Sequence, residues 1–198
     1  MRSSESIIDE NRQLRRTMRD LVALSTLPAI WVGLDLRGIA RSLSDVLLNT
    51  LSLDLIYVRL SSMSNDDVIE LVRSRHQRNV LLEPIRTALT PFLVDTRGDH
   101  SSTTIPDPTG TGILHVAVTR FGVADDHGVL ISASRNSEFP TEQDRLLLGV
   151  VANQTAILLQ RQRTEAQVRQ QSEQLRTTLA SIGDAVITTD LSGRVTNI

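Results

Sequence analysis

The histidines are the first residues to consider as catalytic groups or metal ligands, and the chain has four: His76, His100, His115 and His127. Their spacings do not match two ligands on adjacent turns of one helix, and the chain contains no cysteine. A structural zinc site needs clustered cysteine and histidine ligands, so we expect no metal site. The lack of cysteine also excludes disulfides and a thiol nucleophile.

His115 lies in a segment of alternating apolar residues, Gly112 to Thr119. Alternate residues of a strand face opposite sides of a sheet. If Leu114, Val116 and Val118 pack on helices, His115 points to the other side, where it could bind a ligand or a haem iron. A hydrogen-bonded or partly exposed histidine of an ordinary sheet is the simpler interpretation.

The same alternation suggests one polar patch on the sheet, and a few convergent polar groups are typical of ligand pockets. Its members are Tyr57, Arg59, His115, Thr119 and Ser132. Which face of the sheet carries a ligand is an assumption at this stage. The alternative is an ordinary sheet face that is covered by loops.

Several other kinds of chemistry find no support in the sequence. No Gly-x-Ser-x-Gly nucleophile elbow is present. The glycines of Thr109 to Gly112 are not followed by the Lys-Ser/Thr pair of a phosphate-binding loop. The net charge of -2 lacks the basic surplus of a nucleic-acid-binding protein. The most apolar stretch, Leu21 to Leu36, is interrupted by polar residues and by Pro28, so we expect no membrane span.

The elements that would position these residues follow from apolar periodicity. We expect amphipathic helices over Ile7 to Leu24 and Leu36 to Leu51, with Asp35 capping the second. A further helix is expected over Asp66 to Ser74, and Val80 to Val94 could be strand or helix. The expected strands are Leu53 to Leu60, Gly112 to Phe121 and Val129 to Arg135. Asp95 to Thr111 is rich in turn-forming residues and predicts a long surface loop.

A single long helix is expected over Thr141 to Ile182, beginning with the capping box of Thr141 and Asp144. Its second half carries a heptad stripe, which suits pairing with a second copy of the chain. The stripe consists of Val168, Ser172, Leu175, Leu179 and Ile182. Because Arg161 and Glu165 interrupt the stripe upstream, we expect a weak, adjustable pairing. The alternative is a frayed, solvated linker.

Beyond Gly183, two short apolar segments, Ala185 to Thr189 and Arg194 to Ile198, flank the turn-like Asp190 to Gly193. This pattern predicts a hairpin. Two strands are marginally stable on their own, so we expect the hairpin to open a further domain.

Three blocks of the chain resemble a GAF domain: GIARSLSDVLLNTLSLDLIYVRL, GVLISASR and FPTEQDRLLLGVVANQTAILLQRQR. The block LRTTLASIGDAVITTDLSGRVTNI resembles the entry to a PAS domain. The resemblance implies an α+β fold: a central antiparallel sheet with the N-terminal and long C-terminal helices on one face and variable loops on the other. It also implies the order of sensor domains found upstream of a histidine kinase core. Chromophore-binding GAF relatives attach a bilin through cysteine, which this chain lacks. The Asn-Lys-Phe-Asp pattern of cyclic-nucleotide-binding relatives is missing as well.

The expected organisation has four parts: an N-terminal amphipathic helix (1–27), a GAF-like domain (28–160), a coiled-coil signalling helix (161–182) and a truncated PAS-like start (183–198). We expect a cytoplasmic, homodimeric sensory module without catalytic activity of its own. It would act on downstream PAS and kinase domains of the same chain, without nucleic acid, and with no cofactor beyond an unidentified small-molecule ligand. The alternatives are the sensory module of a diguanylate cyclase or another signalling enzyme, and a ligand-free dimerising spacer.

Overall fold

The structure is a computed structural model, and it divides into two compact units, Met1–Gln160 and Arg161–Ile198. It describes residues 2–62, 67–77, 81–94, 102–123, 126–181, 188–189, 192 and 194–197. The helices are α1 (Arg2–Ser25), α2 (Leu27–Ile30), α3 (Leu36–Thr50), α4 (Leu82–Val94) and α5 (Glu142–Ser181). The strands are β1 (Leu55–Ser62), β2 (Asp67–Ser74), β3 (Ser102–Pro106), β4 (Ile113–Val123), β5 (Asp126–Ser134), β6 (Thr188–Thr189) and β7 (Val195–Asn197).

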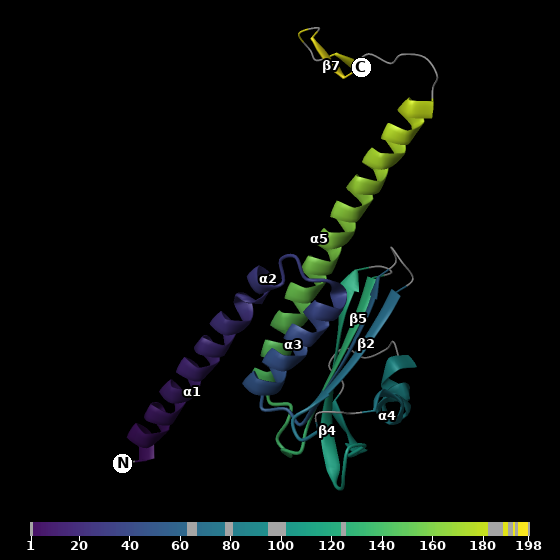
Figure 1. Ribbon diagram of the computed structural model, residues 1–198. Helices are drawn as coiled ribbons and strands as arrows, with labels where there is room; N and C mark the ends of the chain where they lie inside the picture. The colour runs from purple at the N-terminus through teal and green to yellow at the C-terminus, as the bar shows by residue number, and fades with distance from the viewer. Residues whose placement is uncertain are drawn as a thin grey trace. The chain divides into compact units, whose positions relative to one another are not determined.

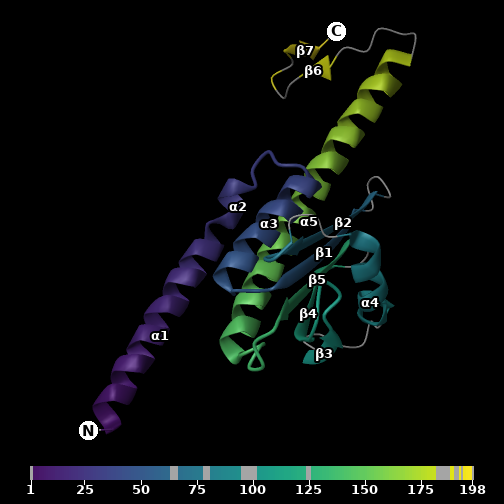
Figure 2. The ribbon, with the colours of Figure 1, turned by 60° about the horizontal axis from the view of Figure 1, so that its bottom comes forward.

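Five of the described strands form one antiparallel sheet in the order β2-β1-β5-β4-β3. Helices α3 and α5 lie on one face of this sheet and α4 lies on the opposite face (Figure 1, Figure 2). We call these the helix face and the α4 face. The expected α+β architecture with an antiparallel sheet and flanking helices is confirmed, although a helix rather than loops alone covers the second face.

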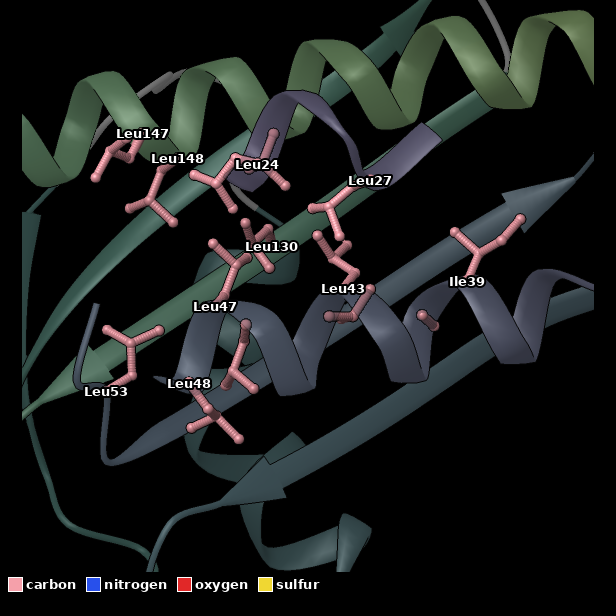
Figure 3. Close-up of a cluster of buried hydrophobic side chains, with 14 of the residues drawn as sticks. Leu24, Leu27, Ile39, Leu43, Leu47, Leu48, Leu53, Leu130, Leu147 and Leu148 are labelled. Carbon is pink, nitrogen blue, oxygen red and sulfur yellow. The ribbon is translucent and has the colours of Figure 1, made fainter. Parts of the chain in front are cut away.

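The helix face carries the larger apolar core (Figure 3). Leu43 and Leu47 of α3, Leu147 and Leu148 of α5, and Leu130 of β5 belong to this one cluster of buried side chains. Fully burying one leucine side chain stabilises a fold by about 1.5–3 kcal/mol. The first part of α5 is therefore held firmly against the sheet.

The α4 face carries a second core. Ile85 and Leu89 of α4 are buried against sheet residues that alternate with those of the helix face. These sheet residues are Leu55, Tyr57, Ile105, Leu114, Val116, Val118, Val129, Ile131 and Ala133. Both faces of the sheet are thus covered, and the apolar stretches at residues 55–58 of β1 and 129–131 of β5 suit this burial on both sides.

The start of each long helix on the helix face is fixed by a side chain. The Asp35 carboxylate accepts a hydrogen bond from the backbone N–H of Gly38 at 2.7 Å, which confirms the expected cap of α3. The backbone N–H of Thr141 donates to Asp144 Oδ2 at 2.9 Å, and the N–H of Asp144 donates to Thr141 Oγ1 at 3.2 Å. This reciprocal pair is the predicted capping box.

Two expected elements differ from the structure. The helix expected over Asp66 to Ser74 is wrong, because residues 67–74 form strand β2, paired with β1 along its whole length. The loop expected over Asp95 to Thr111 contains strand β3, which pairs with β4. The open alternative for Val80 to Val94 is resolved as helix for the described residues, 82–94.

The C-terminal predictions are met in part. Helix α5 runs for 40 residues, close to the expected length. Strands β6 and β7 pair as a short hairpin, but Ile182 and most of Ala185 to Thr189 lie outside the described residues. The PAS-like identity of this hairpin and the four-part domain division therefore stay predictions.

Candidate functional site

The five residues of the predicted polar patch lie on two different faces of the sheet. Ser132 is paired with Ile56 on one side and with Ala117 on the other, and both belong to the core of the helix face. His115 and Thr119 share that face because they alternate in register with Ala117. Tyr57 and Arg59 lie on the α4 face. The structure does not bring the five together, and ligand binding by them as one set remains untested.

The assumption that Leu114, Val116 and Val118 pack on the long helices is wrong. Leu114, Val116 and Val118 pack in the core of the α4 face, not beneath the long helices. His115 therefore points toward the helix side, where it is half-buried and pairs across the strands with Ser134. Its proposed contact with a ligand or a haem iron stays a prediction.

A polar cluster forms on the α4 face around the two remaining residues. We call it the Tyr57 cluster, and it consists of Tyr57, Arg59, Glu70 and Arg86. One Glu70 oxygen lies 3.7 Å from Arg59 Nε, and the other lies 3.7 Å from Arg86 Nε. The Glu70 side chain is only 11% exposed, so one largely buried carboxylate faces two guanidinium groups.

Tyr57 is fully buried, and its hydroxyl makes no hydrogen bond of normal geometry among the described residues, although the Glu70 carboxylate lies near it. Burial raises the pKa of Tyr57 well above its ordinary value, and the neighbouring Glu70 carboxylate raises it further. The hydroxyl therefore stays protonated at neutral pH. A buried hydroxyl without a partner costs free energy, so such a group in a native fold calls for an explanation.

Strand register and helix packing assemble the cluster. Arg59 of β1 and Glu70 of β2 are directly opposite partners, which is a favourable arrangement for opposite charges on one sheet face. Arg86 is brought over them by α4, whose buried Ile85 and Leu89 fix the helix on the sheet. Arg120 of β4 also connects the sheet to α4, because its guanidinium donates a hydrogen bond to the backbone carbonyl of Phe92.

Sequence reasoning found Tyr57 and Arg59 but missed Glu70 and Arg86. The helix expected over Asp66 to Ser74 contains Glu70, and Arg86 lies in the segment Val80 to Val94, whose pattern fits either a strand or a helix. A signal was present: Val68, Glu70 and Val72 alternate as a strand would, with a carboxylate inserted in an apolar face. Such a residue needs a cationic partner when it is buried.

A second polar cluster joins loops at one end of the sheet. Asp54 Oδ2 accepts a hydrogen bond from the backbone N–H of Arg135 at 2.7 Å, and Asp54 Oδ1 lies 2.9 Å from His76 Nε2. Burial alone would raise the pKa of Asp54, but the hydrogen bond from Arg135 and the contact with His76 outweigh it and lower the pKa. All groups here have partners, so we interpret this cluster as structural.

Metal and membrane sites were also sought. Among the described residues, no three His, Asp or Glu side chains gather as metal ligands. Within the same residues, no helix is both long and apolar enough to cross a bilayer.

The comparisons with known proteins bear on the fold. Neither a scan of known protein families nor a search of curated proteins found a match to this chain. Among solved structures, the chain is similar to the GAF domain of a provisionally assigned sensor histidine kinase from Pseudomonas syringae pv. tomato. The TM-score is 0.55 at 18% sequence identity, over 81% of this chain and 99% of the other. The fold is therefore GAF-like.

Proposed function

We propose that the chain is the sensory and regulatory part of a signal-transduction protein, and that the parent protein is a two-component sensor histidine kinase. A stimulus at the sheet domain alters how the sheet packs on its helices. Helix α5 then carries the change, as one of a pair of helices in a homodimer, to a following PAS domain and a kinase core. The chain described here has no catalytic role in this scheme.

The course of α5 is the observation that carries the proposal. Its N-terminal half packs in the sheet core through Leu147, Val151 and Leu159. Residues 164–179 of the same helix are all exposed. A helix that begins in a domain core and continues for several turns with its side chains exposed, as far as the described residues show, is suited to link that domain to another part of the protein.

Homodimerisation is supported by apolar side chains that nothing in the described structure covers. On α1, Leu14, Met18 and Val22 are four residues apart and more than half exposed. On the second half of α5, Val168 and Leu175 of the predicted stripe are likewise more than half exposed. Isolated helices of this kind are marginal in water and gain stability mainly from packing. A second copy of the chain offers matching stripes.

The likeness to a GAF domain supports the sensory class. In the similar structure, the domain is assigned to a sensor histidine kinase, which agrees with the order of domains implied by the sequence resemblance. A diguanylate cyclase or another signalling enzyme as the parent is the alternative, because sensory modules are combined with several kinds of output.

A ligand-free dimerising spacer is a second candidate, and one observation favours it. The α4 face of the sheet is filled by an apolar core rather than being left open. The Tyr57 cluster within that face favours sensing instead, because a spacer has no need for a buried carboxylate and an unpartnered hydroxyl.

The proposal is tested by joining the chain through α5, in helical register, to the first helix of a histidine kinase core and measuring autophosphorylation. Insertions after Gln160 change the phase of the helix by about 100° per residue. Two inserted residues, a rotation of about 200°, should change the activity strongly. Seven inserted residues, which restore the phase to within about 20°, should return it. Activity that is independent of phase would contradict transmission through α5.

A further inference from the structure

We infer that the Tyr57 cluster binds the anionic head group of a small molecule, a carboxylate or a phosphate. This inference rests on the proposed sensory function and names the class of stimulus. The four residues come from three elements, β1, β2 and α4, so an anion bound among them would hold α4 against the sheet.

The charge of the cluster is the first argument. Two guanidinium groups face one largely buried carboxylate, and the Tyr57 hydroxyl is neutral, so these four residues carry a net charge of about +1. The Glu83 carboxylate lies 3.6 Å from Arg86 Nη1, but its side chain is 79% exposed, so water screens its charge more strongly than that of Glu70. The side chains of Arg59 and Arg86 are 36% and 48% exposed, and each approaches Glu70 through Nε. A planar guanidinium is suited to bind a carboxylate or a phosphate through two parallel hydrogen bonds.

The geometry of the contacts is the second argument. Both contacts of Glu70 measure 3.7 Å, which is longer than a hydrogen bond. By comparison, Arg135 and the buried carboxylate of Asp107 approach to 2.7 Å in the same protein. The donors of the Tyr57 cluster are thus not closed into short hydrogen bonds, and within the described part of the chain its buried hydroxyl makes no hydrogen bond of normal geometry. One bound oxyanion that accepts from the arginines and from the Tyr57 hydroxyl would satisfy these groups.

The role of Glu70 follows from the same geometry. Its carboxylate orients both arginines while the site is empty, but it repels an incoming anion. Removing the negative charge of Glu70 should therefore raise the affinity for an anion rather than lower it. Glu70→Gln should strengthen anion binding, whereas loss of a merely structural ion pair would have no such effect.

The test is isothermal titration calorimetry of the 198-residue chain with inorganic phosphate and, separately, with succinate, against chloride at matched ionic strength. Saturable binding of one of the two is expected, and which one binds identifies the head group. Arg59→Gln and Arg86→Gln should each weaken binding about tenfold or more. Arg73→Gln is the matched control, since Arg73 is a similarly exposed arginine of β2 that pairs with Asp45 of α3 at 3.6 Å.

Tyr57→Phe separates binding from folding. It removes a hydroxyl that makes no hydrogen bond of normal geometry among the described residues, so the melting temperature of the unliganded chain should not fall, while anion affinity should fall. The inference is overturned if neither probe binds saturably, if Arg73→Gln weakens binding as much as Arg59→Gln, or if Glu70→Gln weakens it.

The outcomes also separate this inference from the proposed function. If the phase of α5 controls a fused kinase but neither anion binds, the inference fails and the function stands. If an anion binds as predicted but the fused kinase ignores both the anion and the phase of α5, the site stands and the function fails.

Discussion

The guanidinium of Arg135 donates two hydrogen bonds to one oxygen of Asp107, from Nη2 at 2.7 Å and from Nε at 3.2 Å. The other oxygen accepts from the backbone N–H and the hydroxyl of Thr109, at 2.8 and 2.7 Å. Asp107 lies in the β3–β4 turn, and Arg135 directly follows β5 on the way to α5. The pair therefore fastens that turn to the segment from which α5 starts.

Replacing Asp107 with Asn should destabilise the fold by about 1–3 kcal/mol, because a buried acceptor of charged hydrogen bonds loses its charge. Chemical denaturation measures this change. Asp45→Asn is the control: Asp45 is 54% exposed in its pair with Arg73, so the expected loss is below about 0.5 kcal/mol. Equal losses in the two variants would contradict a special role for the Asp107 pair.

The same residue should make stability depend on acid. Burial alone would raise the pKa of Asp107, but the hydrogen bonds from Arg135 and Thr109 outweigh it and lower the pKa below 3.8. The unfolded chain then binds the proton more readily, so this stabilisation is complete well above pH 3.8 and is lost as the pH falls below it. Unfolding curves between about pH 5 and pH 3 should show a steeper loss for the native chain than for Asp107→Asn. Parallel pH curves would contradict the pKa shift.

The capping box of α5 gives another prediction. Thr141→Ala should cost about 1 kcal/mol, because the N–H of Asp144 loses its acceptor at the start of the helix. Thr177→Ala is the control within the same helix, since the Thr177 hydroxyl only bonds back to the carbonyl of Glu173. That variant should be neutral or slightly stabilising, because alanine favours helix. Thermal unfolding of both variants provides the comparison.

The exposed stripe of α1 should matter for assembly. Met18→Glu places a charge at the centre of the stripe formed with Leu14 and Val22, and it should shift a dimer toward monomer in sedimentation experiments. Ala23→Glu adds the same charge at an exposed position on the other side of α1 and should leave the dimer unchanged. Equal effects from both variants would rule out this stripe as the interface.

Much of the fold could be predicted from local patterns. The caps of α3 and α5 and the strands β1, β4 and β5 follow from side chains that act on their own neighbours. Strand β2 is harder to predict in this way, because the apolar residues of Asp67–Ser74 are interrupted by Glu70 and suit two turns of helix as well as the alternation of a strand. Its pairing with β1, a contact between distant segments, decides the outcome.

The site was predicted less well than the fold. The alternation of side chains along β1 correctly places Tyr57 and Arg59 on the same face of that strand. It does not show which residues of β4 and β5 lie on that same face of the sheet. That depends on register, and the register of Ile56 with Ser132 places Ser132 on the helix face. Arg86 depends on α4, whose packing on the sheet has no local signature.

The central claim is that α5 pairs with a second copy of itself beyond the sheet domain, and a distance between labels tests it most directly. The chain has no cysteine, so Gln170→Cys carries one spin label at an exposed position of α5, on the side of the helix opposite the Val168 and Leu175 stripe. Paired helices with axes about 8–10 Å apart predict a distinct distance on the order of 20–30 Å between the two labels. Pulsed dipolar spectroscopy that finds no such distance at any protein concentration would contradict the account.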